Sequence, residues 1–416
     1  MSNPKTNVRR AAVSALKAWA NGHTYMDTLI DRHSSRNHLS REDRSLLQNI
    51  LNTVLRNRRL LDHWISKLRK GKLDHDTRDI LRVGLAQILI IGIPDHAAVN
   101  ETVNCGKAPV RGLINAVLRR AILKRKQLLS DAEELAPDVL YSHPGWLYKR
   151  WRQEFGKANA IKLMQLNNQS ADTFARVNPL VAEGAEALAN SDVAEAVEDV
   201  DGFYRITGAM PHEWLNNGYI YIQDLATRHS VELMDPQPDE IILDACAAPG
   251  GKAVLAAAAM QNSGELVCTD SNAKRLPRLQ ENLQRLKVAN ASVDVHDWTK
   301  PAPADWHGKF DAILLDVPCS NTGVIRRRID VRWRLQLESI DEQVATQMSI
   351  LENALPCLKP TGRLIYSTCS IESRENSELV AEFIAKHPKL KLADERIITP
   401  FADDTDGAYA ARLELK

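Results

Sequence analysis

Residues 244–252 have the sequence Asp-Ala-Cys-Ala-Ala-Pro-Gly-Gly-Lys, and this stretch decides the fold of the second half of the chain. The short apolar run Ile241–Leu243 precedes it and the alanine-rich run Ala253–Met260 follows it, which predicts a strand, a tight loop and a helix. Glycines allow the backbone to approach a ligand closely, and the start of a helix offers free N–H groups. The loop has neither the Gly-x-Gly-x-x-Gly spacing of dinucleotide-binding folds nor the spacing of a Walker loop.

A carboxylate follows the next predicted strand. That strand ends at Asp270, 19 residues after Gly251. An acidic side chain at this place can accept hydrogen bonds from both hydroxyl groups of a ribose. The loop and Asp270 together predict a pocket for a nucleoside cofactor. The alternative is a structural turn followed by a surface aspartate.

Strands and helices alternate through residues 236–416, which predicts an α/β domain with a doubly wound, mainly parallel, Rossmann-like sheet. The predicted strands are Ile241–Leu243, Leu266–Thr269, Ser292–Val295, Ala312–Leu315 and Leu364–Tyr366, and the predicted helices include Lys274–Leu286 and Asp341–Leu355.

The first part of the chain has a different pattern. Residues 1–130 carry apolar side chains at helical spacing, for example from Leu46 to Leu55, and predict an all-α bundle. We expect Asp76 to cap one of its helices and Pro94 to end that helix. Residues 131–235 predict a small α+β module. Its expected elements are the turn His143–Trp146, the strands Phe174–Val177, Phe203–Ile206 and Tyr219–Ile222, and the helix Glu183–Leu188.

The charge of the chain is distributed unevenly. The net charge is only +1, but residues 1–130 contain 24 Lys and Arg against 10 Asp and Glu, a net +14, and the remaining residues have a net −13. A basic first part favours a polyanion such as RNA as its partner, whereas a solvated basic surface is the alternative. No targeting or membrane segment is visible, since the apolar run Val83–Ile93 is too short to cross a bilayer, and we expect a cytoplasmic monomer.

Two of the six cysteines lie at the ends of predicted strands. Cys319 is in Asp316-Val-Pro-Cys-Ser320 and Cys369 is in Ser-Thr-Cys-Ser. The carboxyl edge of an open α/β sheet is where ligands bind, so these two thiols are candidates for a reactive group. The other cysteines, Cys105, Cys246, Cys268 and Cys357, form no Cys-x-x-Cys pair, which argues against a structural zinc site and a disulfide framework. A zinc deaminase needs a second cysteine shortly after its Pro-Cys motif. Residue 322 is Thr, so the zinc deaminase class is excluded.

These motifs, in this order, resemble the RNA cytosine-5 methyltransferases. The segments that carry the resemblance are Ala247–Lys252, Asp316–Ser320, Thr322-Gly323 and Thr368–Ser370. The helical first part is similar to NusB-type RNA-binding domains through residues 93–101, Ile-Pro-Asp-His-Ala-Ala-Val-Asn-Glu. The combination implies that the substrate is 16S ribosomal RNA or a precursor of the small subunit, with transfer RNA as an alternative.

The resemblance also implies a role for each matching residue. S-adenosylmethionine would bind at Cys246, Ala247, Ala248, Pro249, Gly250, Gly251 and Lys252, with Asp270 at the ribose, Asp297 near the adenine and Asp316 beside both cofactor and base. Cys369 would be the nucleophile that attacks the base, and Cys319 would assist release of the product. DNA cytosine methyltransferases use the cysteine that corresponds to Cys319 instead. No metal is expected.

Some positions depart from the pattern of the family. Val317 replaces a common alanine, Ala253 a common threonine, Arg328-Ile329 a common His-Pro, and Ala408-Tyr409 a common Phe-Phe. None of these changes removes a group that the chemistry needs, and the last two concern the surface expected to meet the RNA. A non-catalytic RNA-binding or assembly factor with a methyltransferase fold is the alternative from another functional class.

Overall fold

The structure, a computed structural model, describes residues 7–22 and 24–416. The chain divides into two compact units. The first unit contains the residues up to Gln169 together with the segment Arg328–Arg334, and the second contains Ser170–Arg327 and Leu335–Lys416. The chain therefore leaves the helical unit after Gln169 and returns to it once, far along the sequence.

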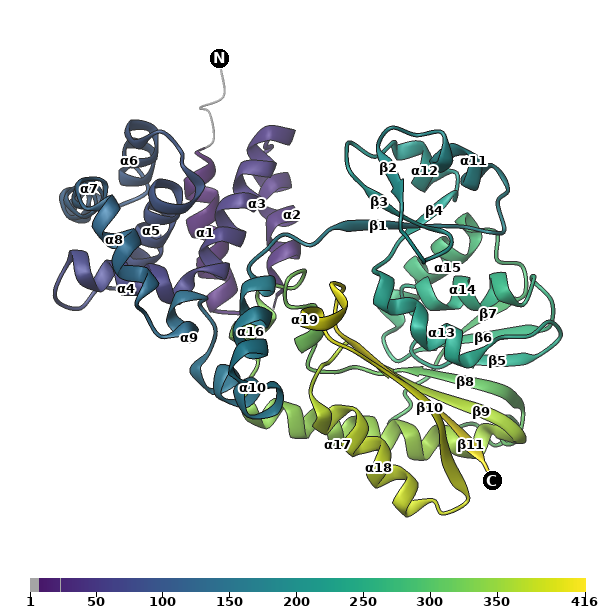
Figure 1. Ribbon diagram of the computed structural model, residues 1–416. Coiled ribbons are helices and arrows are strands. Elements are labelled where there is room, and N and C mark those ends of the chain that lie inside the picture. The colour runs from purple at the N-terminus through teal and green to yellow at the C-terminus, as the bar shows by residue number, and fades with distance from the viewer. Residues whose placement is uncertain (1–6, 23) are drawn as a thin grey trace. The chain divides into compact units, whose positions relative to one another are not determined.

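The first unit consists of helices, as predicted (Figure 1). Its buried core contains the apolar positions that recur at helical spacing, among them Leu47, Leu51, Leu61 and Trp64. The helices are α1 (Val8–Ala20), α2 (Met26–Arg36), α3 (Arg41–Arg56), α4 (Arg58–Leu68), α5 (His75–Leu85), the π-helix η1 (Ala86–Ile91), α6 (Asp95–Val103), α7 (Ala108–Leu123), α8 (Arg125–Glu133), α9 (Pro137–Leu140), α10 (Gly145–Asn167) and α16 (Val331–Arg334).

Two predicted helix boundaries in this unit are wrong. The N-cap of α5 is Asp74 rather than Asp76, because the Asp74 side chain accepts hydrogen bonds from the amide and the hydroxyl group of Thr77. Asp76 lies in the first turn, where its charge favours the positive end of the helix dipole. Pro94 does not end the helix either, since η1 already ends at Ile91 and its C-cap, Gly92, has a left-handed φ of 79°. Pro94 is instead the N-cap of α6.

The segment Arg328–Arg334 is an integral part of the helical unit. The Arg332 side chain is fully buried and donates hydrogen bonds to the Asn167 carbonyl oxygen and the Asn168 side chain. The Asp330 carboxylate accepts from Trp19 Nε1 at 3.3 Å and from the Met26 amide at 3.1 Å. Buried donors need acceptors, and Asp330 supplies the acceptor for Trp19 and Met26 of the first helices. The segment Arg328–Arg334 therefore completes the hydrogen bonding of the helical core.

The second unit begins with a small antiparallel sheet, as predicted for the α+β module. Its strands are β1 (Thr173–Val177), β2 (Ala194–Ala196), β3 (Phe203–Ile206) and β4 (Ile220–Ile222), in the order β2-β3-β1-β4, with helices α11 (Glu183–Ala189) and α12 (His212–Asn216). The apolar cluster under these helices contains Ala175, Leu188 and Trp214.

The rest of the second unit is the predicted doubly wound sheet. Its strands are β5 (Ile241–Asp244), β6 (Glu265–Asp270), β7 (Ala291–Val295), β8 (Phe310–Asp316), β9 (Leu358–Thr368), β10 (Leu390–Ile398) and β11 (Ala408–Leu415). The order is β10-β11-β9-β8-β5-β6-β7; strands β9 to β7 in this order are parallel, while β10 and β11 form an antiparallel edge. The sequence patterns did not predict β10 and β11.

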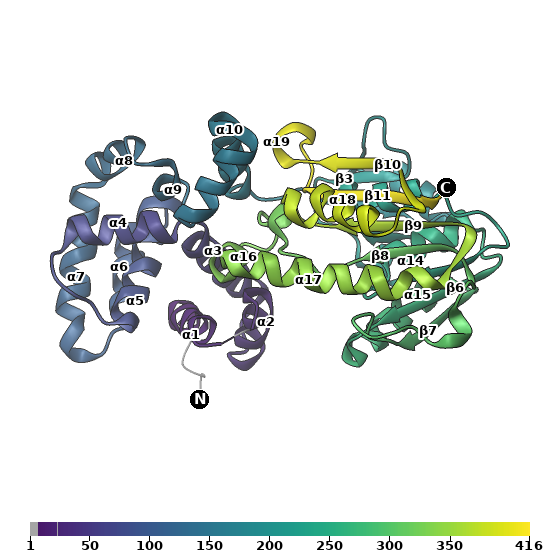
Figure 2. The ribbon, with the colours of Figure 1, turned by 90° about the horizontal axis from the view of Figure 1, so that it is seen from below.

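Helices cover both faces of the large sheet (Figure 1, Figure 2). One face packs against α13 (His229–Met234), α14 (Gly251–Ala259) and α15 (Leu276–Arg285), and the other against α17 (Leu337–Ala354) and α18 (Ser377–Lys386). The remaining short helices are η2 (Leu225–Arg228), η3 (Ala273–Arg275), η4 (Ala304–Trp306), η5 (Thr322–Val324), η6 (Leu355–Cys357), η7 (Ser373–Glu375) and α19 (Pro400–Asp403).

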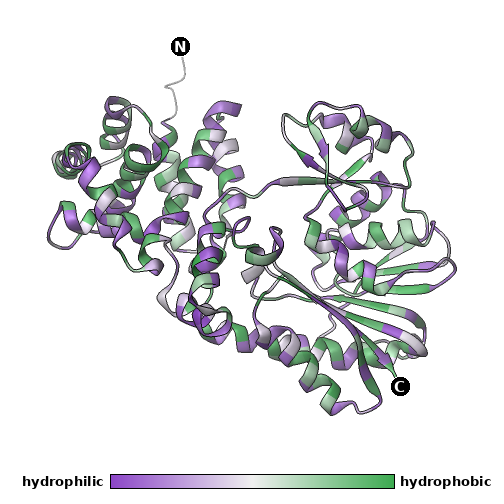
Figure 3. Cartoon of the chain, in the orientation of Figure 1, coloured by the Kyte–Doolittle hydropathy of each residue, from purple (hydrophilic) through white to green (hydrophobic). Residues whose placement is uncertain are grey.

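The hydropathy colouring agrees with this layered arrangement. The central strands of the large sheet are mainly hydrophobic in Figure 3, as strands covered on both faces must be. Of the helices that the structure describes, none has the length and apolar character needed to cross a membrane.

Replacing Asp330 by alanine should destabilise the helical unit, because Trp19 Nε1 and the Met26 amide would lose their buried acceptor. A buried donor without a partner costs about 1–3 kcal/mol, and each kcal/mol lowers the melting temperature by roughly 2–4 °C in a unit of this size. Differential scanning calorimetry should show this shift, whereas the exposed control Asp192→Ala should melt like the unmodified protein. Equal melting of both variants would show that the segment is dispensable for stability.

Candidate active site

Four parallel strands bring polar residues to one edge of the large sheet. Strands β5, β6 and β8 end at Asp244, Asp270 and Asp316, and β9 ends at Thr368, directly before Cys369. The register places Asp316 beside Ser367 on neighbouring strands. The structure therefore gathers the sequence-predicted residues at the carboxyl edge, where ligands bind in open α/β sheets.

The two glycines of the loop lie too close to neighbouring side chains to carry a Cβ atom. Gly250 has a φ of 106°, a left-handed conformation that favours glycine, and a Cβ atom there would lie 2.9 Å from the Leu279 side chain. A Cβ atom on Gly251 would lie 2.7 Å from the Tyr221 ring. The Ala247 amide donates to the Thr269 carbonyl oxygen at 2.8 Å, which ties the loop to β6. The loop thus presents backbone and the start of α14, as an anion or nucleoside pocket requires.

The acidic residues around this loop have different surroundings. Asp244 is buried, and burial raises its pKa to about 7, with a further contribution from the negative charge of Asp316. Asp270 is also buried and accepts hydrogen bonds from Arg275 at 2.8 Å and from the Asn272 amide at 2.9 Å. These two carboxylates offer acceptor sites for the hydroxyl or ammonium groups of a ligand.

Asp297 lies in the turn after β7. Its carboxylate accepts from the Thr299 hydroxyl group at 2.7 Å and from the Thr299 amide at 3.1 Å, and these bonds lower its pKa. Since β6 and β7 are neighbouring strands, Asp270 and Asp297 follow adjacent strands of the sheet.

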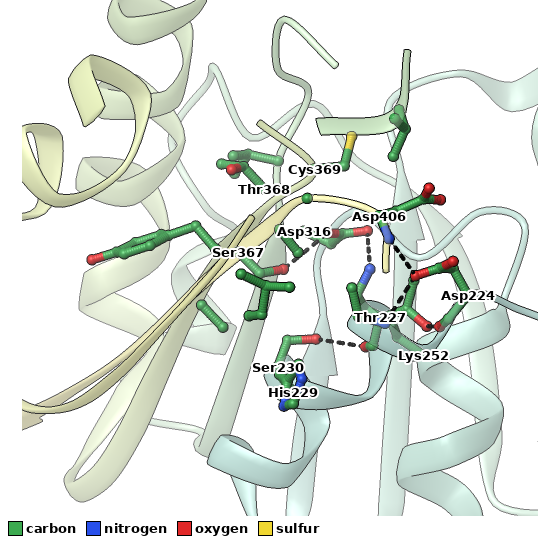
Figure 4. A pocket seen from close by; sticks show the side chains of 18 residues that line it. Asp224, Thr227, His229, Ser230, Lys252, Asp316, Ser367, Thr368, Cys369 and Asp406 are labelled. Carbon is green, nitrogen blue, oxygen red and sulfur yellow. Dashed lines mark hydrogen bonds and ion pairs between the residues drawn. The ribbon is translucent and has the colours of Figure 1, made fainter. Parts of the chain in front are cut away.

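Lys252, the last residue of the glycine loop, forms an ion pair with Asp316. Lys252 Nζ lies 2.7 Å from one carboxylate oxygen, and the Ser367 hydroxyl group donates to the other at 2.9 Å (Figure 4). Burial by itself would lower the pKa of Lys252, but the charge of Asp316 and its hydrogen bond raise the pKa above the usual value. This ion pair joins the glycine loop to the end of β8 and places a positive charge next to a negative charge.

The two predicted cysteines lie side by side. Their sulfur atoms are 3.2 Å apart, and Cys369 Sγ donates to Asn321 Oδ1 at 3.3 Å. Cys319 is buried, whereas Cys369 is partly exposed. The hydrogen bond with Cys369 and burial raise the pKa of Cys319 well above the usual value for a thiol. The pair therefore combines an accessible sulfur with a buried thiol that retains its proton.

A cavity opens beside the ion pair. Cys369 lies on its wall together with Lys252 and Asp316, and Cys319 does not line it (Figure 4). The lining residues are Asp224, Ala226, Thr227, His229, Ser230, Lys252, Asp316, Val317, Val324, Ser367, Thr368, Cys369, Ile398, Asp406, Gly407, Ala408, Tyr409 and Ala410.

Sequence reasoning missed two walls of this cavity. One comes from Asp224 to Ser230, before and within α13, and the other from the turn that leads into β11. Asp224 and Asp406 are held by Arg327, which donates to Asp224 at 2.7 Å and also pairs with Asp406. The sequence signal closest to these walls is Ala408-Tyr409, where the chain departs from the family pattern, and both residues line the cavity.

The remaining cysteines lie away from the cavity wall. Cys268 and Cys357 are buried, as expected, and Cys105 is only partly buried, with its Sγ near the Glu101 carbonyl oxygen. Within residues 7–22 and 24–416, no three His, Cys, Asp or Glu side chains form a group that could hold a metal ion.

Models of three protein families match the chain. They are described as 16S rRNA methyltransferase RsmB/F for residues 231–413, NusB family for residues 6–123, and the ferredoxin-like domain of RsmF/B-like methyltransferases for residues 143–194. These matches confirm the predicted NusB-like bundle, the small α+β module and the methyltransferase domain.

Similar proteins and solved structures cover most of the chain. The ribosomal RNA small subunit methyltransferases B of Serratia proteamaculans and Yersinia pseudotuberculosis are 35% and 36% identical to it, over 90% of this chain and 91% of theirs. The crystal structure of PH0851 has a TM-score of 0.78 at 25% identity and covers 100% of this chain and 99% of its own. NSun6 from Pyrococcus horikoshii, solved with SFG, shares the fold over 65% of this chain and 98% of its own, with a TM-score of 0.59 at 21% identity. The chain therefore belongs to the RsmB/F family of 16S rRNA methyltransferases, which use S-adenosylmethionine.

Proposed function

We propose that the protein methylates carbon 5 of a cytosine in 16S ribosomal RNA, through a covalent bond between Cys369 and the base. The observation that carries this proposal is the shared cavity of Cys369, Lys252 and Asp316, with the Cys319 sulfur 3.2 Å behind the Cys369 sulfur. This set places a nucleophile, a cation and an acceptor around one space, with a second thiol next to the nucleophile.

The covalent step solves a problem of reactivity. Carbon 5 of cytosine is a poor nucleophile, but addition of the Cys369 thiolate to carbon 6 turns the ring into an enamine-like adduct whose carbon 5 is nucleophilic. S-adenosylmethionine, when bound, supplies the electrophilic methyl group. The target base must leave its stack so that both carbon 6 and carbon 5 can be reached.

Lys252 and Asp316 would position the base and balance its charge. The amino group of cytosine is a hydrogen-bond donor, and the Asp316 carboxylate is an acceptor at the wall of the cavity. The Lys252 ammonium group, 2.7 Å from Asp316, would offset negative charge that develops on the ring after the thiolate adds.

Release of the product needs the loss of the proton on carbon 5 and cleavage of the bond between sulfur and carbon 6. We assign assistance in this step to Cys319, which lies within contact of Cys369 but behind the cavity wall. A solvent water or hydroxide accepts the proton of carbon 5, and the electron pair left behind forms the double bond between carbons 5 and 6. The Cys369 thiolate is thereby expelled, with the protonated Cys319 thiol as a hydrogen-bond donor to it.

The cofactor would bind at the neighbouring strand ends. We assign the glycine loop from Cys246 to Lys252 to the body of S-adenosylmethionine, Asp270 to the ribose and Asp297 to the adenine, in agreement with the positions of these residues after β5, β6 and β7. The domains at 1–130, 131–235 and 236–416, the cytoplasmic location and the monomeric state also stay predictions.

Two alternatives predict other outcomes. The same chemistry on transfer RNA uses the same site, and no feature of the cavity favours it. A non-catalytic assembly factor would not need the ion pair or the adjacent thiols, so these features argue against it. Transfer of radiolabelled methyl groups to 16S ribosomal RNA and not to transfer RNA would support the proposal over both.

Asp270→Ala should weaken the binding of S-adenosylmethionine, because a buried acceptor for the ribose hydroxyls is lost. The expected loss is about 1–3 kcal/mol, or roughly 5- to 150-fold in the dissociation constant. Isothermal titration calorimetry measures it, with the exposed Asp294→Ala on the adjacent strand as a control. If Asp270→Ala and the control bind equally well, Asp270 does not belong to the cofactor site.

Single alanine variants of the two cysteines should behave in opposite ways. Cys369→Ala should be inactive and form no covalent complex, because the nucleophile is missing. Cys319→Ala should add to the base, accept the methyl group and then accumulate protein joined to RNA. Denaturing gel electrophoresis with RNA and S-adenosylmethionine detects the complex as a slow band. The reverse pattern would exchange the two roles, and methylation without any band in either variant would exclude the covalent mechanism.

Basic side chains of the helical unit should bind the RNA backbone. Replacing Arg119, Lys124 and Lys126 by glutamine should weaken RNA binding and reduce its salt dependence, with a slope that falls by about 0.7 per lost phosphate contact on single-stranded RNA. The control removes the same number of exposed charges, at Lys386, Lys389 and Lys391 of the second unit. Filter binding at several salt concentrations should separate the two variants; equal slopes would assign RNA binding to another surface.

A further inference from the structure

A buried carboxylate that the proposed reaction does not use lies next to both cysteine loops. Glu375 is the last residue of η7 and is completely buried. It comes only six residues after Cys369, but it also reaches the loop of Cys319, which is distant in sequence. Because an ionised side chain is rarely buried without partners, its contacts indicate what it holds.

Four donors converge on the two oxygens of this carboxylate. Oε1 accepts from the Ser320 amide at 2.8 Å and from Gln347 Nε2 at 3.0 Å. Oε2 accepts from the Ser370 hydroxyl group at 2.6 Å and from the Ser320 hydroxyl group. A carboxylate has about four lone-pair sites, so these donors match its whole capacity as an acceptor.

The residues held in this way directly follow the two cysteines. Ser320 follows Cys319 and Ser370 follows Cys369, so a single carboxylate binds both loops at the residue next to each thiol. The next residue, Asn376, adds to this clamp by donating to the Ser370 carbonyl oxygen at 2.9 Å. The distance of 3.2 Å between the two sulfur atoms therefore depends on the Glu375 carboxylate as well as on the pairing of β8 with β9.

The charges around the two thiols are also unequal. The negative charge of Glu375 contributes to the raised pKa of Cys319, after the hydrogen bond with Cys369 and burial. The interaction with Cys369 contributes to the raised pKa of Lys252, after the effects of burial and of Asp316. A carboxylate thus acts on the Cys319 side and an ammonium group on the Cys369 side, which favours a thiol at the first position and a thiolate at the second.

We propose that Glu375 is a positioning residue that clamps the two cysteine loops together and holds the Cys319 side chain beside the attacking sulfur of Cys369. The proposal rests on the proposed function for the roles of the two thiols. The clamp itself is a property of the free enzyme, so it can be tested without RNA.

Glu375→Gln keeps the shape of the side chain but removes its charge and places an NH₂ group among the donors. We expect kcat to fall by about 10²-fold, the effect of a misplacement near 1 Å, while the dissociation constants for S-adenosylmethionine and RNA stay within twofold. In the free enzyme, NMR of ¹³Cβ-labelled cysteine should show that the upper of the two titration steps of the thiol pair moves to lower pH. The exposed Glu378→Gln should match the unmodified protein in all of these measurements.

Unchanged kcat together with unchanged thiol titration in Glu375→Gln would overturn the proposal. If that variant does not fold, Ser320→Ala removes one donor of the clamp on the Cys319 side and leaves the carboxylate in place. It should then release product slowly and accumulate the covalent complex, and release at the normal rate would count against the clamp. A shifted thiol titration in an enzyme that methylates no RNA would support the clamp and reject the proposed function.

Discussion

The ion pair between Lys252 and Asp316 is the constraint on which the candidate site depends. It joins the end of the glycine loop to the end of β8, with the Ser367 hydroxyl group of β9 on the other carboxylate oxygen. A partly buried charge is stabilised by a partner of opposite sign, and each member of this pair supplies that partner for the other. The cofactor loop, the central strand and the strand that leads to Cys369 are therefore held in one fixed arrangement.

The loop between Cys319 and α17 has partners in both units of the chain. Near the thiols, the Gly323 amide donates to the Cys369 carbonyl oxygen at 3.0 Å, and the Gly407 amide donates to Gly323 at 2.8 Å. A few residues later, Asp330 and Arg332 lie in the core of the helical unit. The segment that follows Cys319 thus also contributes to the helical unit. Arg328 and Ile329, where the chain departs from the family pattern, belong to this segment, and Ile329 is buried in the core of the helical unit.

The two thiols are chemically identical, but their surroundings give them different accessibility and different neighbouring charges. Both follow parallel strands, and their position at the sheet edge does not distinguish them. Only Cys369 lines the cavity, while Cys319 is buried behind it and close to the Glu375 carboxylate. Access and local charge therefore support the proposed assignment of attack to Cys369, which the motif resemblance also implies.

The sequence by itself determined the elements whose signals are local. Helical spacing predicted the bundle, alternating strands and helices predicted the sheet, and the glycine loop and the cysteine motifs marked the strand ends where the site lies. Local patterns failed at the α5 cap, at the end of η1 and at β10 and β11, where short-range preferences compete with packing. Only the tertiary structure decided the pairing of Lys252 with Asp316, the cavity walls at Asp224 and Asp406, the return of residues 328–334 and the partners of Glu375. These contacts join residues far apart in the chain, and burial, which makes each donor and charge need a partner, is created only when the chain folds.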